Sequence, residues 1–476
     1  MSSYLFYDLE TTGLNKAFDQ VLQFAAIRTD TVLNEIERHN IIIKLRPDII
    51  PTPQATITHR ISIADSMQGS CEFEAMIKIH RLMNQPGTIS IGYNSLRFDD
   101  EFLRFCFHRN LLPPYTHQYK NGCRRSDLLP IAIMYHLYKP EILLWPKIND
   151  KPSLKLEKIN EVNKLTTGQA HDAMVDVKIT LELARKLRKE VKMWKYLDGY
   201  FDKTEDNRRI EKIPVSFHSI ACSNRIGLMI NKEFGAENKY QALVLFIGNS
   251  ISYKNQTLWL RLDQIELQDI NIDNIATKSY VIRKKYGEPG IVLPFIEHYN
   301  FLTAKTLAIV EKNKEWLQSH STLFHEIIKY HQEFKYPKIP DLGCDVALYQ
   351  NGFLSAQEQE LCRQFHKTDL AGKIDIVSQF ESIDMRKQAS RLLCRNYPAN
   401  LPLMLTRDFA EYMRLVNPNN PEDALQDYKN DKRTTPKSAL IQIDKLLKEE
   451  KLDKQQIELL EELEKYVKTN FKLNSN

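Results

Sequence analysis

The chain has 476 residues, a hydrophobic fraction of 42% and a formal net charge of only +5, which favours packed domains over disorder and gives a weak basic signal. Its seven cysteines include no C-x-x-C pair, so the composition indicates neither a zinc site nor a disulfide framework. No apolar run approaches the length of a membrane span and no basic-then-apolar leader is present, so we expect a cytoplasmic protein that does not enter a membrane.

An acidic pair closes the first predicted strand. Residues 4–8 are aromatic and apolar, as in a short buried strand, and Asp8 and Glu10 stand at its end. Side chains two residues apart on a strand point to the same side, so the two carboxylates would lie together. Carboxylates that close repel each other unless a cation neutralises them, and Mg²⁺ prefers such oxygen ligands. The alternative is a strand end with two solvated acids.

A second acidic segment follows further strands. The sequence predicts strands over residues 22–29, 40–45 and 88–93, and a helix over residues 73–83. After the last of these strands, a loop leads to Asp99 and Asp100, at the start of a helix predicted over residues 101–110. Asp99 could add a carboxylate to the first pair, or both residues could simply cap free backbone N–H groups of the helix.

The third segment combines a histidine with another acid. Helices are predicted over residues 128–137 and 173–189, and Asp176 lies in the first turns of the second one, with His171 just before it. A carboxylate fixed on a helix suits a metal ligand, and a histidine on a loop suits a general base. The alternative is Asp172 as a helix cap and His171 as an ordinary surface histidine.

The pattern of elements divides the chain into several parts. Alternating strands and helices predict a mixed α/β domain over residues 1–190. Residues 191–212 are polar and charged and are predicted as a linker. Strand-like runs predict a small β-rich domain over residues 213–342, and apolar residues at helical spacing predict an all-α domain over residues 345–470.

Several motifs carry a resemblance to a known family. They are FAAIRTD at residues 24–30, GYN followed by RFDDE within residues 92–101, HDAM at residues 171–174 and LYQNGF at residues 348–353. In these motifs, and in the order of its acidic residues and His171, the sequence resembles the DEDD exonuclease superfamily in its histidine-bearing subtype. Within that superfamily it is most similar to the bacterial exodeoxyribonuclease I family.

The resemblance implies a fold, an activity and partners. The fold would be an RNase H-like α/β exonuclease domain, a small β-rich SH3-like domain and an all-α C-terminal domain. The activity would be degradation of single-stranded DNA from the 3′ end, with release of deoxynucleoside 5′-monophosphates, in DNA repair and recombination. The implied partner, besides single-stranded DNA, is the acidic C-terminal tail of single-strand DNA-binding protein, and the enzyme would be a monomer.

The resemblance also implies roles for the candidate site residues. Asp8, Glu10 and Asp176 would hold two Mg²⁺ ions, for which Mn²⁺ would substitute. Asp99 would complete the catalytic acidic set, and His171 would be the general base. Two metals about 4 Å apart would activate a water and stabilise the leaving 3′ oxygen.

Basic and aromatic side chains alternate after the second acidic segment, as in proteins that track phosphates and stack bases. The residues predicted to contact the strand are Glu10, Arg104, Tyr115, Tyr119, Arg124, Arg125 and Lys155. Tyr119 stands where the family carries a tryptophan. Lys155 stands where the family carries an arginine. A lysine keeps the positive charge, but it cannot make the two parallel hydrogen bonds that a guanidinium group makes to a phosphate. The alternative is that this segment is a loop with ordinary surface charge. Tyr7 stands where the family carries a histidine, and we predict no role for it.

Two other functions fit part of the pattern. An exoribonuclease that trims RNA from the 3′ end would use the same acidic site, but compact RNA trimmers lack long additions beyond the nuclease domain. A non-catalytic scaffold that binds single strands would need no acidic set, and here the set is complete in the sequence.

Overall fold

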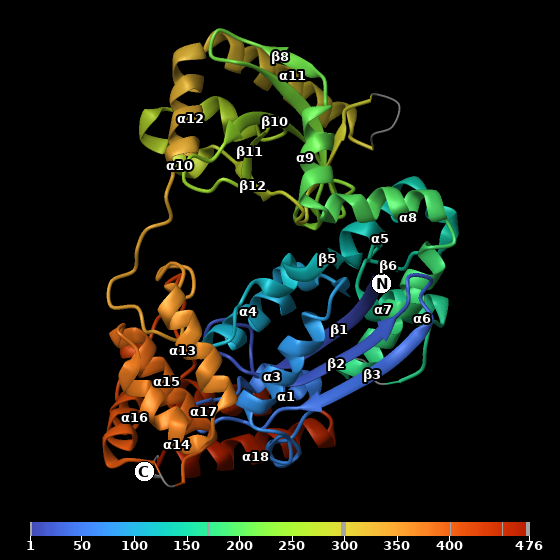
Figure 1. Cartoon of the computed structure of the whole chain (residues 1–476). Helices are drawn as coiled ribbons and strands as arrows, with labels where there is room; N and C mark the ends of the chain where they lie inside the picture. Colours follow the sequence, from blue (N-terminus) through green and yellow to red (C-terminus); the bar gives the residue numbers. More distant parts are fainter. Residues whose placement is uncertain (1, 169–171, 297–300, 400, 450, 473–476) are drawn as a thin grey trace.

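The computed structural model describes residues 2–168, 172–296, 301–399, 401–449 and 451–472. Figure 1 shows three parts: an N-terminal part from β1 to α7, a middle part from β8 to α12 and a C-terminal part from α13 to α18. The segment after α12 runs from the middle part to the C-terminal part, which lies beside the N-terminal part (Figure 1). This layout agrees with the predicted order of an α/β, a β-rich and a helical region.

The N-terminal part is built on a mixed sheet. In the described residues this sheet has five strands in the order β3-β2-β1-β4-β5, with β1 antiparallel to β2 and parallel to β4. The strands are β1 (Ser3–Thr11), β2 (Val21–Thr29), β3 (Glu35–Ile42), β4 (Thr88–Gly92) and β5 (Arg124–Asp127). The helices are α1 (Pro53–His59), α2 (Ile63–Met67), α3 (Glu72–Met83), α4 (Asp99–Arg109), α5 (Leu128–Tyr138), α6 (Leu156–Asn163) and α7 (Ala173–Leu187).

Two strands differ from the prediction. β3 begins well before the strand predicted at residues 40–45, because its first residues are charged and largely exposed and form no apolar run. β5 was not predicted, since the sequence Arg-Arg-Ser-Asp is polar and its strand character comes from backbone pairing with β4. Both strands lie at the edges of the sheet.

Alternation along β1 decides where its acidic residues point. Leu5 and Tyr7 pack in a cluster with side chains of α3 and α4, whereas Phe6 packs with side chains of α5 and α7. Because successive strand residues face opposite sides, Asp8 and Glu10 continue the side of Phe6, over which α7 packs on β1 and β2. Tyr7 is buried on the other side of the sheet.

The middle part carries a second sheet. Residues 191–212, predicted as a linker, form α8 (Val191–Asp198) and α9 (Lys203–Glu211), in which Trp194, Leu197 and Ile210 are buried. In the described residues the second sheet has six strands: β8 (Val215–His218), β9 (Ser223–Ile230), β10 (Gln241–Asn249), β11 (Gln256–Arg261), β12 (Val281–Lys285) and β13 (Ile291–Pro294). Its helices are α10 (Ile275–Lys278), α11 (Ala304–Ser319) and α12 (Ser321–Glu333).

One apolar cluster joins side chains of the N-terminal and middle parts, so the predicted domain boundaries stay a prediction.

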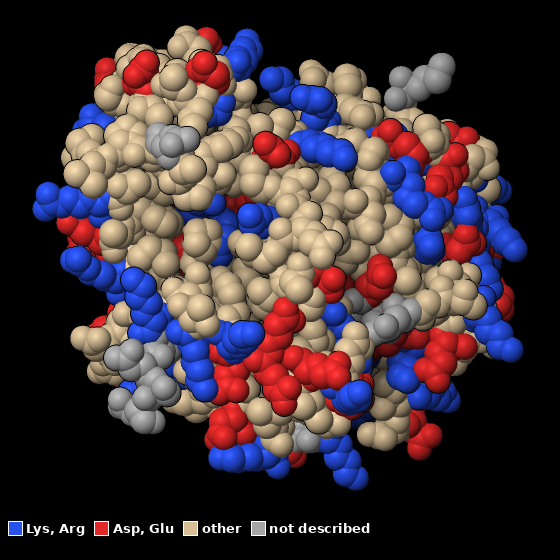
Figure 2. Space-filling model, turned by 90° about the horizontal axis from the view of Figure 1, so that it is seen from below, with Lys and Arg blue, Asp and Glu red and all other residues tan. Residues whose placement is uncertain are grey.

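The C-terminal part is helical. Its helices are α13 (Ala356–Lys367), α14 (Leu370–Gln379), α15 (Ile383–Asn396), α16 (Leu403–Val416), α17 (Pro436–Glu449) and α18 (Lys454–Asn470). α18 packs on α1 and α2 of the N-terminal part. Seen from below, acidic side chains gather toward the lower centre of the surface, basic side chains lie mainly toward its sides, and much of the middle is uncharged (Figure 2). Within the described residues, no helix is both long enough and apolar enough to span a membrane.

Candidate metal-binding active site

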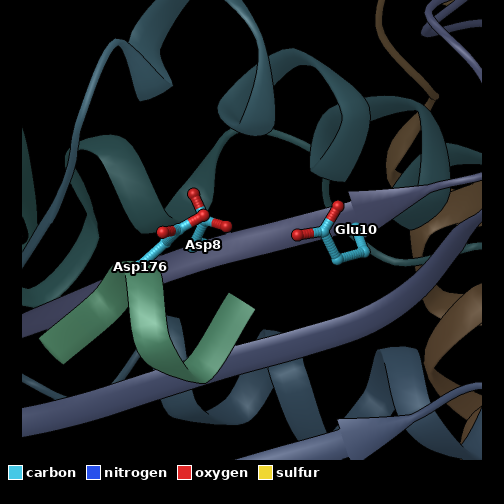
Figure 3. Close-up of side chains that lie close together, drawn as sticks. All are labelled: Asp8, Glu10 and Asp176. Atoms are coloured by element: carbon cyan, nitrogen blue, oxygen red, sulfur yellow. The ribbon is translucent and has the colours of Figure 1, made fainter. Parts of the chain in front are cut away.

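Three carboxylates meet on one side of the N-terminal sheet. Asp8 and Glu10 come from β1 and Asp176 comes from α7, which crosses beside the strand (Figure 3). One carboxylate oxygen from each residue lies within 4.8 Å of those of the other two. Asp172 caps α7 by accepting a hydrogen bond from the backbone N–H of Met174 at 2.9 Å, so Asp176 sits in the first turn of the helix. The structure therefore brings together the three predicted metal ligands.

Asp99 lies beside this group. It is the first residue of α4, it is buried, and its carboxylate lies near the backbone of Leu9, between Asp8 and Glu10. Its negative charge raises the pKa of both acidic residues of β1. Asp99 is therefore placed to complete an acidic set around the three carboxylates.

Burial and mutual repulsion shape the ionisation of these acids. Burial, followed by the charges of Asp99 and Glu10, holds the pKa of Asp8 well above its usual range. Burial, then Asp176 and Asp99, raises the pKa of Glu10 to about 9. Burial, then Asp127, raises the pKa of Asp99 to about 8. Repulsion of this kind is relieved by a divalent cation, whose preferred ligands are carboxylate oxygens, so the donor set fits an ion of the Mg²⁺ type.

Asp127 was not among the predicted site residues, although it holds the loop that leads to Asp99. It ends β5 and caps α5, where it accepts a hydrogen bond from the backbone N–H of Leu129 at 3.0 Å. The same carboxylate accepts the backbone N–H of Asn94 at 2.8 Å. An aspartate directly before an apolar helix is a sequence signal for such a cap, but the contact with Asn94 depends on the pairing of β4 with β5.

Asp8 and Asp176 line a cleft with a volume of about 540 Å³, large enough for a nucleotide. One wall is the hairpin of β6 (Lys147–Ile148) and β7 (Lys151–Pro152) with the segment that leads into α6, including the predicted contact residue Lys155. The middle part supplies Lys232 and Tyr240 to the same cleft. Sequence reasoning missed these two residues, because nothing local in the sequence links them to the acids.

Arg104 and Arg125 are buried rather than open to solvent. Their exposed fractions are 7% and 5%, and both form ion pairs with Asp100. The ring of His117 adds a contact to the same carboxylate at 2.8 Å. Burial alone would raise the pKa of Asp100, but Arg104 and Arg125 outweigh it and hold that pKa well below its usual range. The predicted phosphate contacts of the two arginines thus stay a prediction, and their observed partner is a buried acid.

The remaining predicted contact residues differ in exposure. Tyr119 is 65% exposed, as a stacking platform requires, whereas Tyr115 is half-buried below Arg104, with 5.8 Å between the guanidinium carbon and the ring centre. Arg124 forms an ion pair with Asp198 at 2.7 Å. His171 lies outside the described residues, so its predicted role as a general base stays a prediction.

Comparisons with known proteins agree with this site. The family model RNase_T, described as an exonuclease, matches residues 5–184, which include Asp8, Glu10, Asp99, His171 and Asp176. Exodeoxyribonuclease I of Haemophilus influenzae is 36% identical over 215 residues, which are 44% of this chain and 45% of that protein. Exodeoxyribonuclease I of Escherichia coli is 26% identical over 437 residues, which are 87% of this chain and 90% of that protein.

The likeness extends to the whole fold. The crystal structure of E. coli exonuclease I in complex with a dA16 oligonucleotide superposes with a TM-score of 0.84, covering 99% of this chain and 100% of that chain at 23% sequence identity. This confirms the predicted fold class, an RNase H-like exonuclease domain followed by a β-rich SH3-like region and a helical region. These matches show that residues 5–184 form an exonuclease domain of the RNase_T family and that the chain is similar to exodeoxyribonuclease I over most of its length.

Proposed function

We propose that this protein degrades single-stranded DNA from the 3′ end and releases deoxynucleoside 5′-monophosphates. The observation that carries the proposal is the meeting of the carboxylates of Asp8, Glu10 and Asp176 within 4.8 Å of one another, beside a nucleotide-sized cleft that Asp8 and Asp176 line. The names of the relatives and the oligonucleotide in the E. coli structure support DNA as the substrate.

The roles of the residues follow from their placement. Asp8, Glu10 and Asp176 are the ligands for divalent cations, with Mg²⁺ as the proposed ion and Mn²⁺ as a substitute. Bound cations would supply charge stabilisation for the attacking and leaving oxygens of an in-line displacement, which is the chemistry of two-metal sites. Asp99 adds negative charge beside Asp8 and lies near the backbone of Leu9. His171, directly before α7, is the proposed general base.

Substrate choice can be tested with labelled strands. Single-stranded DNA with a label at the 3′ end should lose it first as a mononucleotide, whereas a label at the 5′ end should remain on a shortening ladder. Duplex DNA should be degraded slowly, because a cleft that admits one strand must first receive a free 3′ end. Faster release from RNA of the same sequence would favour an RNA-trimming exonuclease instead, and early release of the 5′ label would reverse the proposed direction.

The partner and the cellular role rest on the family resemblance. We propose docking to the acidic C-terminal tail of single-strand DNA-binding protein and a role in DNA repair and recombination in the cytoplasm. A fluorescent peptide of that tail should bind the full chain in a salt-dependent way, because the recognition is electrostatic. If the peptide does not bind at low salt, the proposed partner is ruled out, but the proposed nuclease activity is not.

A further inference from the structure

The middle part contributes a cation to the catalytic cleft. Lys232 lies in a short 3₁₀ turn (Lys232–Phe234) after β9 and lines the cleft together with Asp8 and Asp176. Its ammonium group donates a hydrogen bond to the side-chain oxygen of Asn94, in the N-terminal part, at 3.0 Å. Lys232 therefore stands where the middle part meets the acidic site.

Several contacts fix the turn that carries Lys232. Asn231 caps the turn by accepting the backbone N–H of Glu233 at 3.2 Å, and the ring of Phe234 is buried. Glu233 forms an ion pair with Arg97, which lies across the boundary in the N-terminal part. Because these contacts fix the turn and Asn94 holds the ammonium group, Lys232 is positioned before a ligand binds. Little conformational entropy is therefore lost when the ligand binds.

Lys232 makes no direct ion pair in the described residues, although the more distant carboxylate of Asp127 interacts with its charge. Within the described residues, no carboxylate oxygen lies within 4.0 Å of its ammonium group, and its hydrogen-bond acceptor is the neutral amide of Asn94. Lys151 and Lys155 line the same cleft, so the cleft has three lysines as well as the acidic residues Asp8, Glu157 and Asp176. The acidic residues suit cations, and the lysines suit the phosphate anions of a nucleic acid, with which charged donors make the stronger class of hydrogen bond.

We propose that Lys232 binds a phosphate group of the substrate strand in this cleft, so that the middle part forms part of the nucleotide-binding site. The proposal rests on the proposed function and names one further contact of the same site. Because the contact is made to the bound nucleotide before and during the reaction, its loss should weaken binding more than it slows turnover.

Binding of thymidine 5′-monophosphate and thymidine, measured by calorimetry in the presence of Mg²⁺, tests the proposal without cleavage. Lys232→Ala should bind the monophosphate about tenfold more weakly than the wild type, as expected for a lost hydrogen bond to a charged group. Its affinity for thymidine should be unchanged. Lys232→Arg should restore most of the monophosphate affinity. Lys254→Ala, which removes an exposed lysine between β10 and β11, is the matched control and should bind like the wild type.

Kinetics on a single-stranded oligonucleotide give a second measurement. Lys232→Ala should raise KM about tenfold and leave kcat within about twofold, in line with lost substrate binding. Equal binding of the monophosphate by Lys232→Ala and the wild type, or no binding by either, would overturn the proposal. If the wild type releases no nucleotides from DNA, the proposed function fails, while the calorimetric comparison still decides the role of Lys232.

Discussion

Asp100 and Arg125 form a buried ion pair, with 2.7 Å between Arg125 Nη1 and Asp100 Oδ2. Arg125 also reaches Glu288 of the middle part at 3.3 Å. Glu101, the next residue in the chain, accepts a hydrogen bond from the hydroxyl of Tyr428, in the C-terminal part, at 2.7 Å. Since Asp99 belongs to the acidic site, the first turn of α4 connects that site with both other parts of the chain.

Asp100→Ala should lower the free energy of unfolding by about 3–5 kcal/mol, because it leaves Arg104 and Arg125 as buried charges without their carboxylate. Urea unfolding followed by circular dichroism measures the change. Asp444→Ala, which removes an acid paired with Lys448 on an exposed face of α17, serves as the control and should change stability by less than about 1 kcal/mol. If Asp100→Ala also lowered the free energy of unfolding by less than about 1 kcal/mol, the proposed stabilising role of the ion pairs between Asp100 and the two arginines would be contradicted.

Tyr119 and Arg104 should respond differently to substitution. Tyr119→Ala should weaken binding of single-stranded DNA by roughly 1–3 kcal/mol with unchanged protein stability, because an exposed stacking ring is lost. Arg104→Ala should lower stability as well, since Asp100 then loses a buried partner. Salt titrations of a fluorescent oligonucleotide, paired with thermal unfolding, separate the two effects. Wild-type affinity in Tyr119→Ala would place the path of the strand elsewhere.

His171→Ala should reduce the rate of nucleotide release roughly 10²- to 10⁴-fold, the usual range for a lost general base. Affinity for Mn²⁺ should change little, because His171 is not a proposed metal ligand. Single-turnover kinetics and metal titrations on the same preparation measure both quantities. A collapse of metal affinity would instead make His171 a ligand.

The contact between the N-terminal and C-terminal parts should weaken in acid. Arg395 lies 2.9 Å from both Asp48 and Asp345. Burial would raise the pKa of each acid, but Arg395 acts with Arg46 and Arg433 on Asp48 and with Arg391 on Asp345, and together these arginines hold both pKa values below their usual range. Because these pKa values are lower in the folded than in the unfolded state, where they are about 3.9, the stabilisation is present at neutral pH and lost as pH falls below about 5. Thermal unfolding between pH 7 and pH 3 should show this loss, and Arg395→Met should be less stable at pH 7 with a shallower acid dependence.

Part of the site could be predicted from local sequence rules. Asp8 and Glu10 share one side of β1 because strand residues alternate, and Asp176 is fixed by a helix whose cap, Asp172, is visible in the sequence. The burial of Arg125 could not be predicted, because its partner Asp100 lies on another element and the two meet only when β5 pairs with β4. The same holds for Lys232, which reaches the cleft only through the packing of the middle part.

The central claim is that Asp8, Glu10 and Asp176 hold the metal ions that the reaction needs. The most direct test is the rate of mononucleotide release from single-stranded DNA by the wild type, Asp8→Ala and Asp176→Ala, each with Mg²⁺ and with EDTA. The wild type should be active only with Mg²⁺, and each variant should lose at least about a hundredfold in rate while binding the oligonucleotide nearly as well, since each lacks a ligand for the ion that stabilises the reacting oxygens. Near-normal turnover in either variant, or full activity of the wild type in EDTA, would contradict the account.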